Sequence, residues 1–232
     1  MKLKDIIVIL ILIGVLSLFL FVEPLNTWFM QWSGAKDWRY FVLAFCKFGV
    51  LATFGECLGL RISKGVYNQK GFGLMPRAIV WGVLGVVISI AMGVFARGTF
   101  GLLSYFGLDI TPQNLVEQGF GMKILYAFTV SFLMNTFFAP VFMTIHKITD
   151  THILENGGTL KGFFSPIPVG RIITNLNWKV QWNFVFKKTI PFFWYPAHTI
   201  TFLLPKEFQV LFAALLGVAL GVILSTANLK KK

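Results

Sequence analysis

Charged residues are scarce in this sequence, and acidic residues are the scarcest. Of 232 residues only 9 are Asp or Glu, against 21 Lys and Arg, and charged residues make up 13% of the chain, where soluble domains carry about 25%. Hydrophobic residues make up 56%, with 26 Phe and 7 Trp. A soluble domain of this size could not bury so much apolar surface, so lipid must cover much of it. The composition therefore excludes an ordinary soluble domain.

Cysteine is nearly absent, which excludes a disulfide scaffold. Cys46 and Cys57 are the only two, and both lie in one predicted helix. Eleven residues of helix separate their Cα atoms by roughly 16 Å, too far for a disulfide within the chain.

Catalytic signatures are also missing. The sequence has no Walker loop, no His-Glu-x-x-His, no Gly-x-Ser-x-Gly and no paired acidic motif of the kind that intramembrane proteases carry. We therefore expect neither an enzyme nor a cofactor, and a membrane enzyme is a third alternative only. His146, Asp150 and His152 suggest metal ligands, but no further ligand follows at motif spacing, so we expect no metal.

Long uncharged runs are what the sequence has in abundance. Residues 6–22 and 78–96 contain no charge, and each is long enough to cross a bilayer. Weaker runs complete a set of six expected transmembrane helices, over residues 6–22, 40–60, 78–96, 122–144, 189–204 and 208–224. The sequence thus predicts an all-α integral membrane protein, a bundle of about six transmembrane helices in a single membrane domain over residues 1–232.

The basic residues fall mostly on one side of this predicted topology. Fifteen of the 21 share the side of both termini: Lys2, Lys4, Arg61, Lys64, Lys70, Arg77, Lys147, Lys161, Arg171, Lys179, Lys187, Lys188, Lys230, Lys231 and Lys232. Four lie on the other side: Lys36, Arg39, Arg97 and Lys206. Positive charge marks the cytoplasmic side of a membrane protein, so we expect both termini in the cytoplasm, or in the matrix of an organelle.

The net charge of +12 is explained by lipid better than by nucleic acid. The basic residues lie at helix ends and form no continuous stripe. We expect anionic lipids of the cytoplasmic face as partners and no nucleic acid. The bacterial cytoplasmic (inner) membrane is the expected location, with an organelle membrane as the alternative.

Two segments have more than one interpretation. The N-terminal run resembles a secretory signal peptide, but it is longer than a usual h-region and lacks a small-x-small cleavage site before Glu23 and Pro24, which favours an uncleaved signal-anchor. Residues 145–188 form the one sizeable cytoplasmic segment. Its aromatic and basic residues from Trp178 onward suit either a short helix in the headgroup region or an ordinary loop.

Small residues recur on three of the predicted spans at a spacing that puts them on one helix face. They are Gly55 and Gly59, then Gly85, Ser89 and Gly93, and in the last span Ala213, Gly217, Gly221 and Ser225. Such faces allow close approach of a neighbouring helix. They predict a tight bundle or a homo-oligomer without choosing between them.

Polar residues within the predicted spans are the candidate pore or cavity residues: Lys47, Glu56, Arg97, Asn135 and His198. A charge at membrane depth costs at least about 2.5 kcal/mol and tends to face a partner or a water-filled cavity. We expect Glu56, Arg97 and Asn135 to converge on one hydrated cavity. The alternative is that Lys47 and Arg97 snorkel and that Glu56 lies near the interface beside Arg61.

Several local patterns resemble one family, the twenty-two-kilodalton peroxisomal membrane proteins, which include Mpv-seventeen. Its C-terminal Trp-Pro signature is similar to Trp194, Pro196, His198, Thr201, Phe202, Pro205 and Gln209. Earlier family elements are similar to Met134, Asn135 and Pro140, to Gly93, Arg97, Phe100 and Leu103, and to Gly55 and Glu56. Val94, Arg97 and Gln209 depart from the family's Pro, His and Arg. The resemblance covers roughly residues 40–225 and implies a small channel-like or membrane-homeostasis protein.

Two functions therefore remain open. The intramembrane polar residues favour a channel-like or permeability role. The modest size and the lack of an internal repeat favour a non-conducting scaffold or biogenesis factor that binds other membrane helices.

Overall fold

The computed structural model describes residues 3–229, and every regular element in that range is a helix. The chain groups by its internal contacts into two compact units, Met1–Leu43 and Ala44–Lys232, which are described separately. The sequence alone favours a single membrane domain. The boundary between the units falls inside a continuous helix, so no linker marks it.

The first unit contains helices α1 (Leu3–Phe21) and α2 (Glu23–Ser33), with a bend of 80° between them. Val22 is extended at the bend, and Pro24 lies in the first turn of α2, where a missing N–H costs nothing. Asn26 Nδ2 donates to the Phe19 carbonyl across the bend at 3.0 Å. The expected span over residues 6–22 lies mostly in α1, and α1 with α2 could make one broken span.

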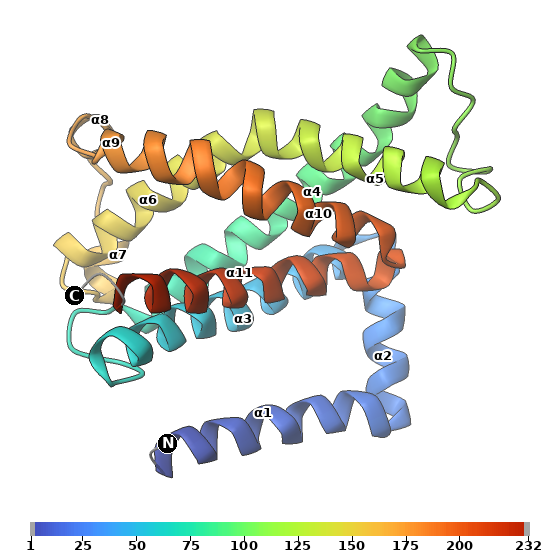
Figure 1. The fold of residues 1–232 in the computed structure, drawn as a ribbon. Coiled ribbons are helices and arrows are strands. Elements are labelled where there is room, and N and C mark those ends of the chain that lie inside the picture. Colours follow the sequence, from blue (N-terminus) through green and yellow to red (C-terminus); the bar gives the residue numbers. More distant parts are fainter. Residues whose placement is uncertain (1–2, 230–232) are drawn as a thin grey trace. The chain divides into compact units, whose positions relative to one another are not determined.

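Long helices dominate the second unit (Figure 1). They are α3 (Trp38–Lys64), α4 (Leu74–Tyr105), the continuous helix Phe120–Glu155 and α11 (Lys206–Leu229). The continuous helix consists of α5 (Phe120–Leu133), a π-helical turn η1 (Met134–Phe138) and α6 (Ala139–Glu155). All four are long and apolar enough to cross a membrane, which supports a membrane-embedded, all-helical protein.

A further long helix differs from its expected form. It consists of α9 (Trp178–Val180), η2 (Gln181–Trp194) and α10 (Tyr195–Leu203), without a break. The expected span over residues 189–204 is the C-terminal part of this helix. The helix is not one of the four that are long and apolar enough to cross a membrane. Six spans remain a prediction.

The connection expected over residues 145–188 is shorter in the structure. Residues 145–155 continue α6, and residues 178–188 already belong to the next long helix. Between the two lie only the short helices α7 (Leu160–Phe163) and α8 (Val169–Thr174).

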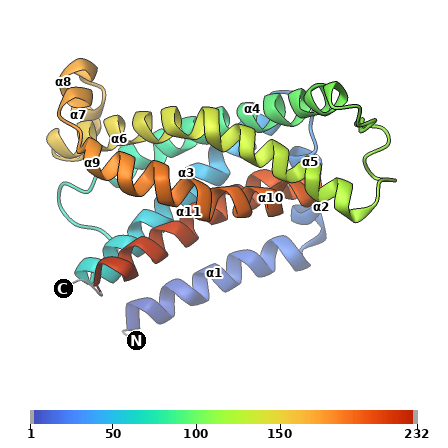
Figure 2. The same ribbon diagram turned by 45° about the horizontal axis from the view of Figure 1, so that its top comes forward.

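Helices α3 and α11 run side by side in the same direction (Figures 1 and 2). A Cβ atom at Gly55 would lie 2.8 Å from the Val218 Cα, and one at Gly59 would lie 2.8 Å from the Ser225 Oγ. One at Gly221 would lie 2.9 Å from the Gly55 carbonyl oxygen. Only glycine permits this approach of the two backbones.

The other small residues differ in what they face. On α4, a Cβ at Gly85 would collide with the Phe48 side chain of α3, and Ser89 is buried. Gly93 has nothing within 4 Å of an added Cβ, and Gly217 would make only an ordinary contact with Ala52. The contact with α3 also includes Val218, a residue that the small-residue pattern alone would assign to another face.

An apolar core joins the remaining helices. Val80 and Leu84 of α4 pack on Phe142 and Ile153 of α6. In a second cluster, Ala139 of α6 packs on η2 and on leucines of α11. The helix Phe120–Glu155 and the helix Trp178–Leu203 lie side by side in opposite directions (Figure 2).

Candidate functional site

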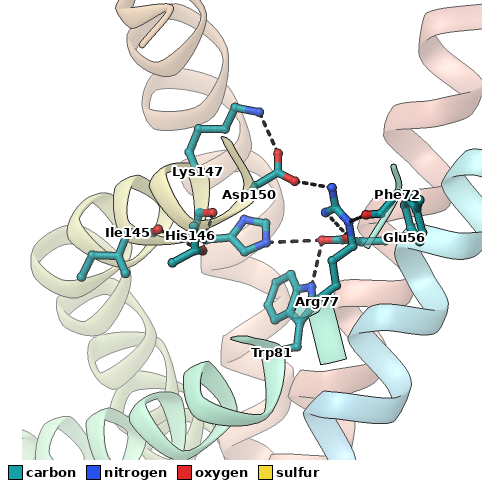
Figure 3. A network of polar contacts seen from close by, with 9 residues as sticks. Glu56, Phe72, Arg77, Trp81, Ile145, His146, Lys147 and Asp150 are labelled. Carbon is teal, nitrogen blue, oxygen red and sulfur yellow. Dashed lines mark hydrogen bonds and ion pairs between the residues drawn. The ribbon is translucent and has the colours of Figure 1, made fainter. Parts of the chain in front are cut away.

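Ionisable side chains gather at the end of the second unit where α3 ends, α4 begins and α6 ends (Figure 3). Glu56 lies two turns before the end of α3, and Arg77 lies in the first turn of α4. His146, Lys147 and Asp150 lie in the last part of α6. We call these five residues the charge cluster.

Arg77 is the centre of the charge cluster. Its guanidinium pairs with the Glu56 carboxylate and, at 2.5 Å, with Asp150 Oδ1. Its Nε donates to the Phe72 carbonyl at 2.7 Å, and the Phe72 ring lies 4.7 Å from the guanidinium carbon. The Arg77 side chain is only 8% exposed. A planar guanidinium suits this bridging role because it presents several donors in one plane.

Glu56 receives contacts from three residues on two neighbouring helices. One oxygen pairs with Arg77, and the other accepts a hydrogen bond from Trp81 Nε1 at 2.8 Å. The second oxygen also lies 3.3 Å from His146 Nε2. The rings of Trp81 and His146 contact each other with 4.4 Å between centroids and a tilt of 39° between their planes. Glu56 thus couples α3 to both α4 and α6.

Asp150 links the cluster to its exposed edge. Its Oδ2 accepts a hydrogen bond from Lys147 Nζ at 3.0 Å, and Lys147 is half-exposed. Its Oδ1 contacts Arg77 as an ion pair without hydrogen-bond geometry.

The cluster is electrically balanced and closely packed. Two carboxylates face one guanidinium and one ammonium, so the sum is zero when His146 is neutral. The side chains around it, with Val80, Thr149 and Ile153, leave no room for a water molecule. Buried charges persist only when paired in this way.

A pair of glycine loops closes over the cluster. Gly73 and Gly158 have positive φ angles of 75° and 67°, which favour glycine. A Cβ at Gly158 would lie 2.5 Å from the Gly73 nitrogen. The α3–α4 loop, which carries Phe72, is therefore held directly against the turn that follows α6.

A second polar site lies between the helices Phe120–Glu155 and Trp178–Leu203. Asn135 and His198 contact each other at 3.0 Å, and Asn135 Nδ2 also donates to the Ser131 carbonyl at 2.8 Å. Ser131 Oγ in turn donates to the Tyr195 carbonyl at 2.8 Å. Asn135 is 1% exposed, and it lies in the π-helical turn η1, an element that often marks functional sites.

The structure brings only some of the expected site residues together. Asn135 and His198 are paired, whereas Glu56 contacts Arg77 and not Arg97. Arg97 is exposed and lies 20 residues after Arg77 on α4, roughly 30 Å along the axis. Lys47 is buried on α3. The expected convergence of Glu56, Arg97 and Asn135 on one cavity is therefore wrong.

Apart from Gly93, which is exposed on α4, the residues of the expected family signature lie at helix junctions or pack against other helices. Pro140 and Pro196 are in the first turns of α6 and α10, and Pro205 lies between α10 and α11. Trp194, Phe202 and Leu103 are buried, and Phe100 stacks on Tyr126.

Arg77 and Trp81 are not expected site residues from the sequence, and Asp150 is considered there only as a metal ligand. The signal that could have found them is spacing, since Arg77 and Trp81, and likewise His146 and Asp150, are four residues apart and share a helix face. His152, which seemed a metal candidate with His146 and Asp150, instead contacts the Phe163 carbonyl at 3.2 Å. Within residues 3–229, no group of three His, Cys, Asp or Glu could hold a metal ion.

Comparison with protein-family models, curated proteins and solved structures finds no match to this chain. The resemblance to the twenty-two-kilodalton peroxisomal family thus depends on the sequence motifs alone.

Proposed function

We propose that this protein is a multi-pass membrane protein with a channel-like or permeability role, and that the charge cluster is its gate. Four long apolar helices are compatible with a membrane protein. Large hydrophobic side chains such as Val83, Val94, Phe137 and Ile200 are exposed on its helices, as lipid contact requires.

The observation that carries the proposal is the charge cluster itself. Five ionisable groups from three helices converge within an apolar bundle. Membrane proteins retain such groups mainly where ions, protons or polar solutes pass. Because Glu56, Arg77 and Asp150 join α3, α4 and α6, breaking their contacts would free three helix ends at once.

The proposed orientation places the charge cluster on the cytoplasmic side, with both termini there and six spans in all. The asymmetry of basic residues supports it. Anionic lipids of a bacterial inner membrane are the proposed partners, and a homo-oligomer is compatible with the exposed small residues of α4, such as Gly93.

A non-conducting scaffold is the second candidate. The observation that favours it is the closely packed, charge-balanced state of the cluster, since a static ion-pair network can specify helix packing without any transport.

Flux through liposomes tests the proposal against the scaffold. The purified protein is reconstituted, and the efflux of small ions and of an uncharged solute is compared with that from protein-free vesicles. A channel-like protein increases efflux in proportion to the amount of protein. Vesicles no leakier than the protein-free control, across a range of voltage and pH, would leave the scaffold as the better account.

A further inference from the structure

A cleft lies on the two glycine loops that close over the charge cluster. Its volume is about 390 Å³, and small-molecule sites commonly have about 300 to 1,000 Å³. Its walls come from the α3–α4 loop, the first turn of α4 and the turn after α6, and they include Asn68, Gln69, Leu74, Met75, Gly158 and Leu160. We call it the loop cleft.

The polar side chains of the loop cleft are free to bind a ligand. Asn68 and Gln69 are exposed, and neither carboxamide makes a hydrogen bond within residues 3–229. Each carboxamide can donate two hydrogen bonds. None of the residues that line the cleft is acidic. These groups suit a ligand that presents oxygen acceptors.

The rim of the loop cleft is basic. Lys70 and Lys161 each follow a lining residue in the sequence, and both are exposed. Neither has an acidic partner in the part of the chain that the structure describes. The acidic side chains at this end of the bundle already pair with arginines, and they are Glu56, Asp150 and Glu155. The two lysines therefore supply positive charge that the protein itself does not neutralise.

Apolar side chains complete the loop cleft. Leu74, Met75 and Leu160 are 39%, 59% and 44% exposed. A soluble anion gains nothing from such side chains, whereas the acyl chains of a lipid do. A ligand that satisfies the amides, the lysines and the apolar side chains together is an anionic amphiphile.

We propose that the loop cleft binds the phosphate-containing headgroup of an anionic phospholipid. Lys70 and Lys161 pair with the phosphate, and Asn68 and Gln69 donate to phosphate or glycerol oxygens. The site rests on the proposed function for its place at the cytoplasmic surface of the membrane.

A bound lipid has a consequence for the charge cluster. The loop cleft includes both loops, and a Cβ atom at Gly158 would lie 2.5 Å from the Gly73 nitrogen. A headgroup that bridges the loops stabilises the arrangement in which Phe72 covers Arg77. The lipid therefore holds the proposed gate closed.

The experiment measures lipid binding to the purified protein in a neutral detergent. Dihexanoyl phosphatidylglycerol is titrated, and binding is followed by the rise in unfolding temperature. Dihexanoyl phosphatidylcholine tests the need for net negative charge. Glycerol 3-phosphate and inorganic phosphate, which have no acyl chains, test whether the ligand is a lipid or a soluble phosphate.

Two double variants remove the same charge from different places. One is Lys70→Gln with Lys161→Gln, at the rim of the loop cleft. The matched control is Lys179→Gln with Lys188→Gln, which are exposed lysines of the helix Trp178–Leu203 on the same side of the expected topology. All four positions are exposed, so both proteins should unfold at the same temperature without lipid.

We expect phosphatidylglycerol to bind about tenfold more weakly to the rim variant than to the unchanged protein, because charge-assisted contacts are lost. The control should bind it like the unchanged protein. Asn68→Leu, which changes no charge, should also weaken binding. Equal weakening in the rim variant and the control, or equally tight binding of phosphatidylcholine, would overturn the inference. Inorganic phosphate or glycerol 3-phosphate that binds as tightly as the lipid would overturn the assignment to a lipid.

Ion flux separates the lipid site from the proposed function. It is recorded in phosphatidylcholine vesicles with an increasing fraction of phosphatidylglycerol. A flux that falls with this fraction in the unchanged protein, and not in the rim variant, supports both proposals. Selective lipid binding by a protein that carries no flux supports the lipid site and contradicts the channel-like function. A flux that persists while the rim variant binds lipid like the unchanged protein supports the function and refutes the site.

Discussion

Arg77 and Asn135 show two ways in which a polar side chain is accommodated in an apolar bundle. Arg77 meets two carboxylates, a carbonyl and an aromatic ring. Asn135 meets a histidine and the backbone and hydroxyl of Ser131. In both cases the partners come from more than one helix, so each residue fixes helix packing as well as its own position.

Replacement of Asn135 tests the second site. Asn135→Ala removes the hydrogen bond that the buried His198 makes with Asn135 and should lower the free energy of unfolding by about 1 kcal/mol. Thermal unfolding in detergent measures it, with the exposed Asn68→Ala as the control. Equal unfolding temperatures for the two variants would show that the Asn135 contacts contribute little.

Sequence reasoning identified Glu56, Asn135 and His198 as polar residues inside apolar runs but not their partners. Arg77 belongs to a loop in the sequence pattern, and in the structure it is the buried end of α4. The partner of a charge depends on which helix ends meet, and a single sequence does not give this. Arg97, the partner expected for Glu56, is exposed on α4 instead.

At the scale of elements, the close contact of α3 with α11 is the strongest packing constraint. Gly221→Ala would place a Cβ 2.9 Å from the Gly55 carbonyl oxygen. We expect a loss of about 1 to 3 kcal/mol in stability, because two backbones must separate. Thermal unfolding of the purified protein in detergent is again the measurement.

Gly98→Ala is the matched control, since nothing lies within 4 Å of its added Cβ. It also lies within a helix, where Ala is favoured over Gly by about 1 kcal/mol, so this variant should gain stability. If both variants shifted the unfolding temperature in the same direction, the close contact of α3 with α11 would not contribute to stability. Val218 cannot serve as a control, because its Cα faces Gly55.

Helix existence follows from sequence more readily than helix extent. Long apolar runs predict α3, α4 and α11 well. The apolar pattern does not predict the helix Trp178–Leu203 in full, because Lys179, Lys187 and Lys188 interrupt it. In addition, 14 residues of this helix are π-helical and contain Pro191, so their side chains do not follow the α-helical repeat.

At the scale of the whole molecule, the loops carrying Lys70 and Lys161 lie at the same end, because the glycines beside them contact each other. Lys206 starts α11, 19 residues before Ser225 at the Gly59 end of α3, roughly 28 Å away along the helix. This agrees with the basic asymmetry of the sequence.

Cysteine labelling from either side of the membrane tests the proposed topology. Reporters at Lys70 and Lys161 should react from the cytoplasmic side, and reporters at Lys36 and Lys206 from the other side. If the reporters at Lys161 and Lys206 reacted from the same side, the helix Trp178–Leu203 would not cross the membrane.

If the charge cluster controls permeation, its charges set the ion selectivity measured in a bilayer recording. Glu56→Gln removes a negative charge from the cluster, and Arg77→Gln removes a positive one. The two should shift the ratio of anion to cation permeability in opposite directions, toward anions for Glu56→Gln and toward cations for Arg77→Gln. Arg97→Gln, on the exposed face of α4, should leave the ratio unchanged. Identical selectivity in the Glu56 and Arg77 variants, or a shift produced by Arg97→Gln alone, would show that the charge cluster does not control permeation.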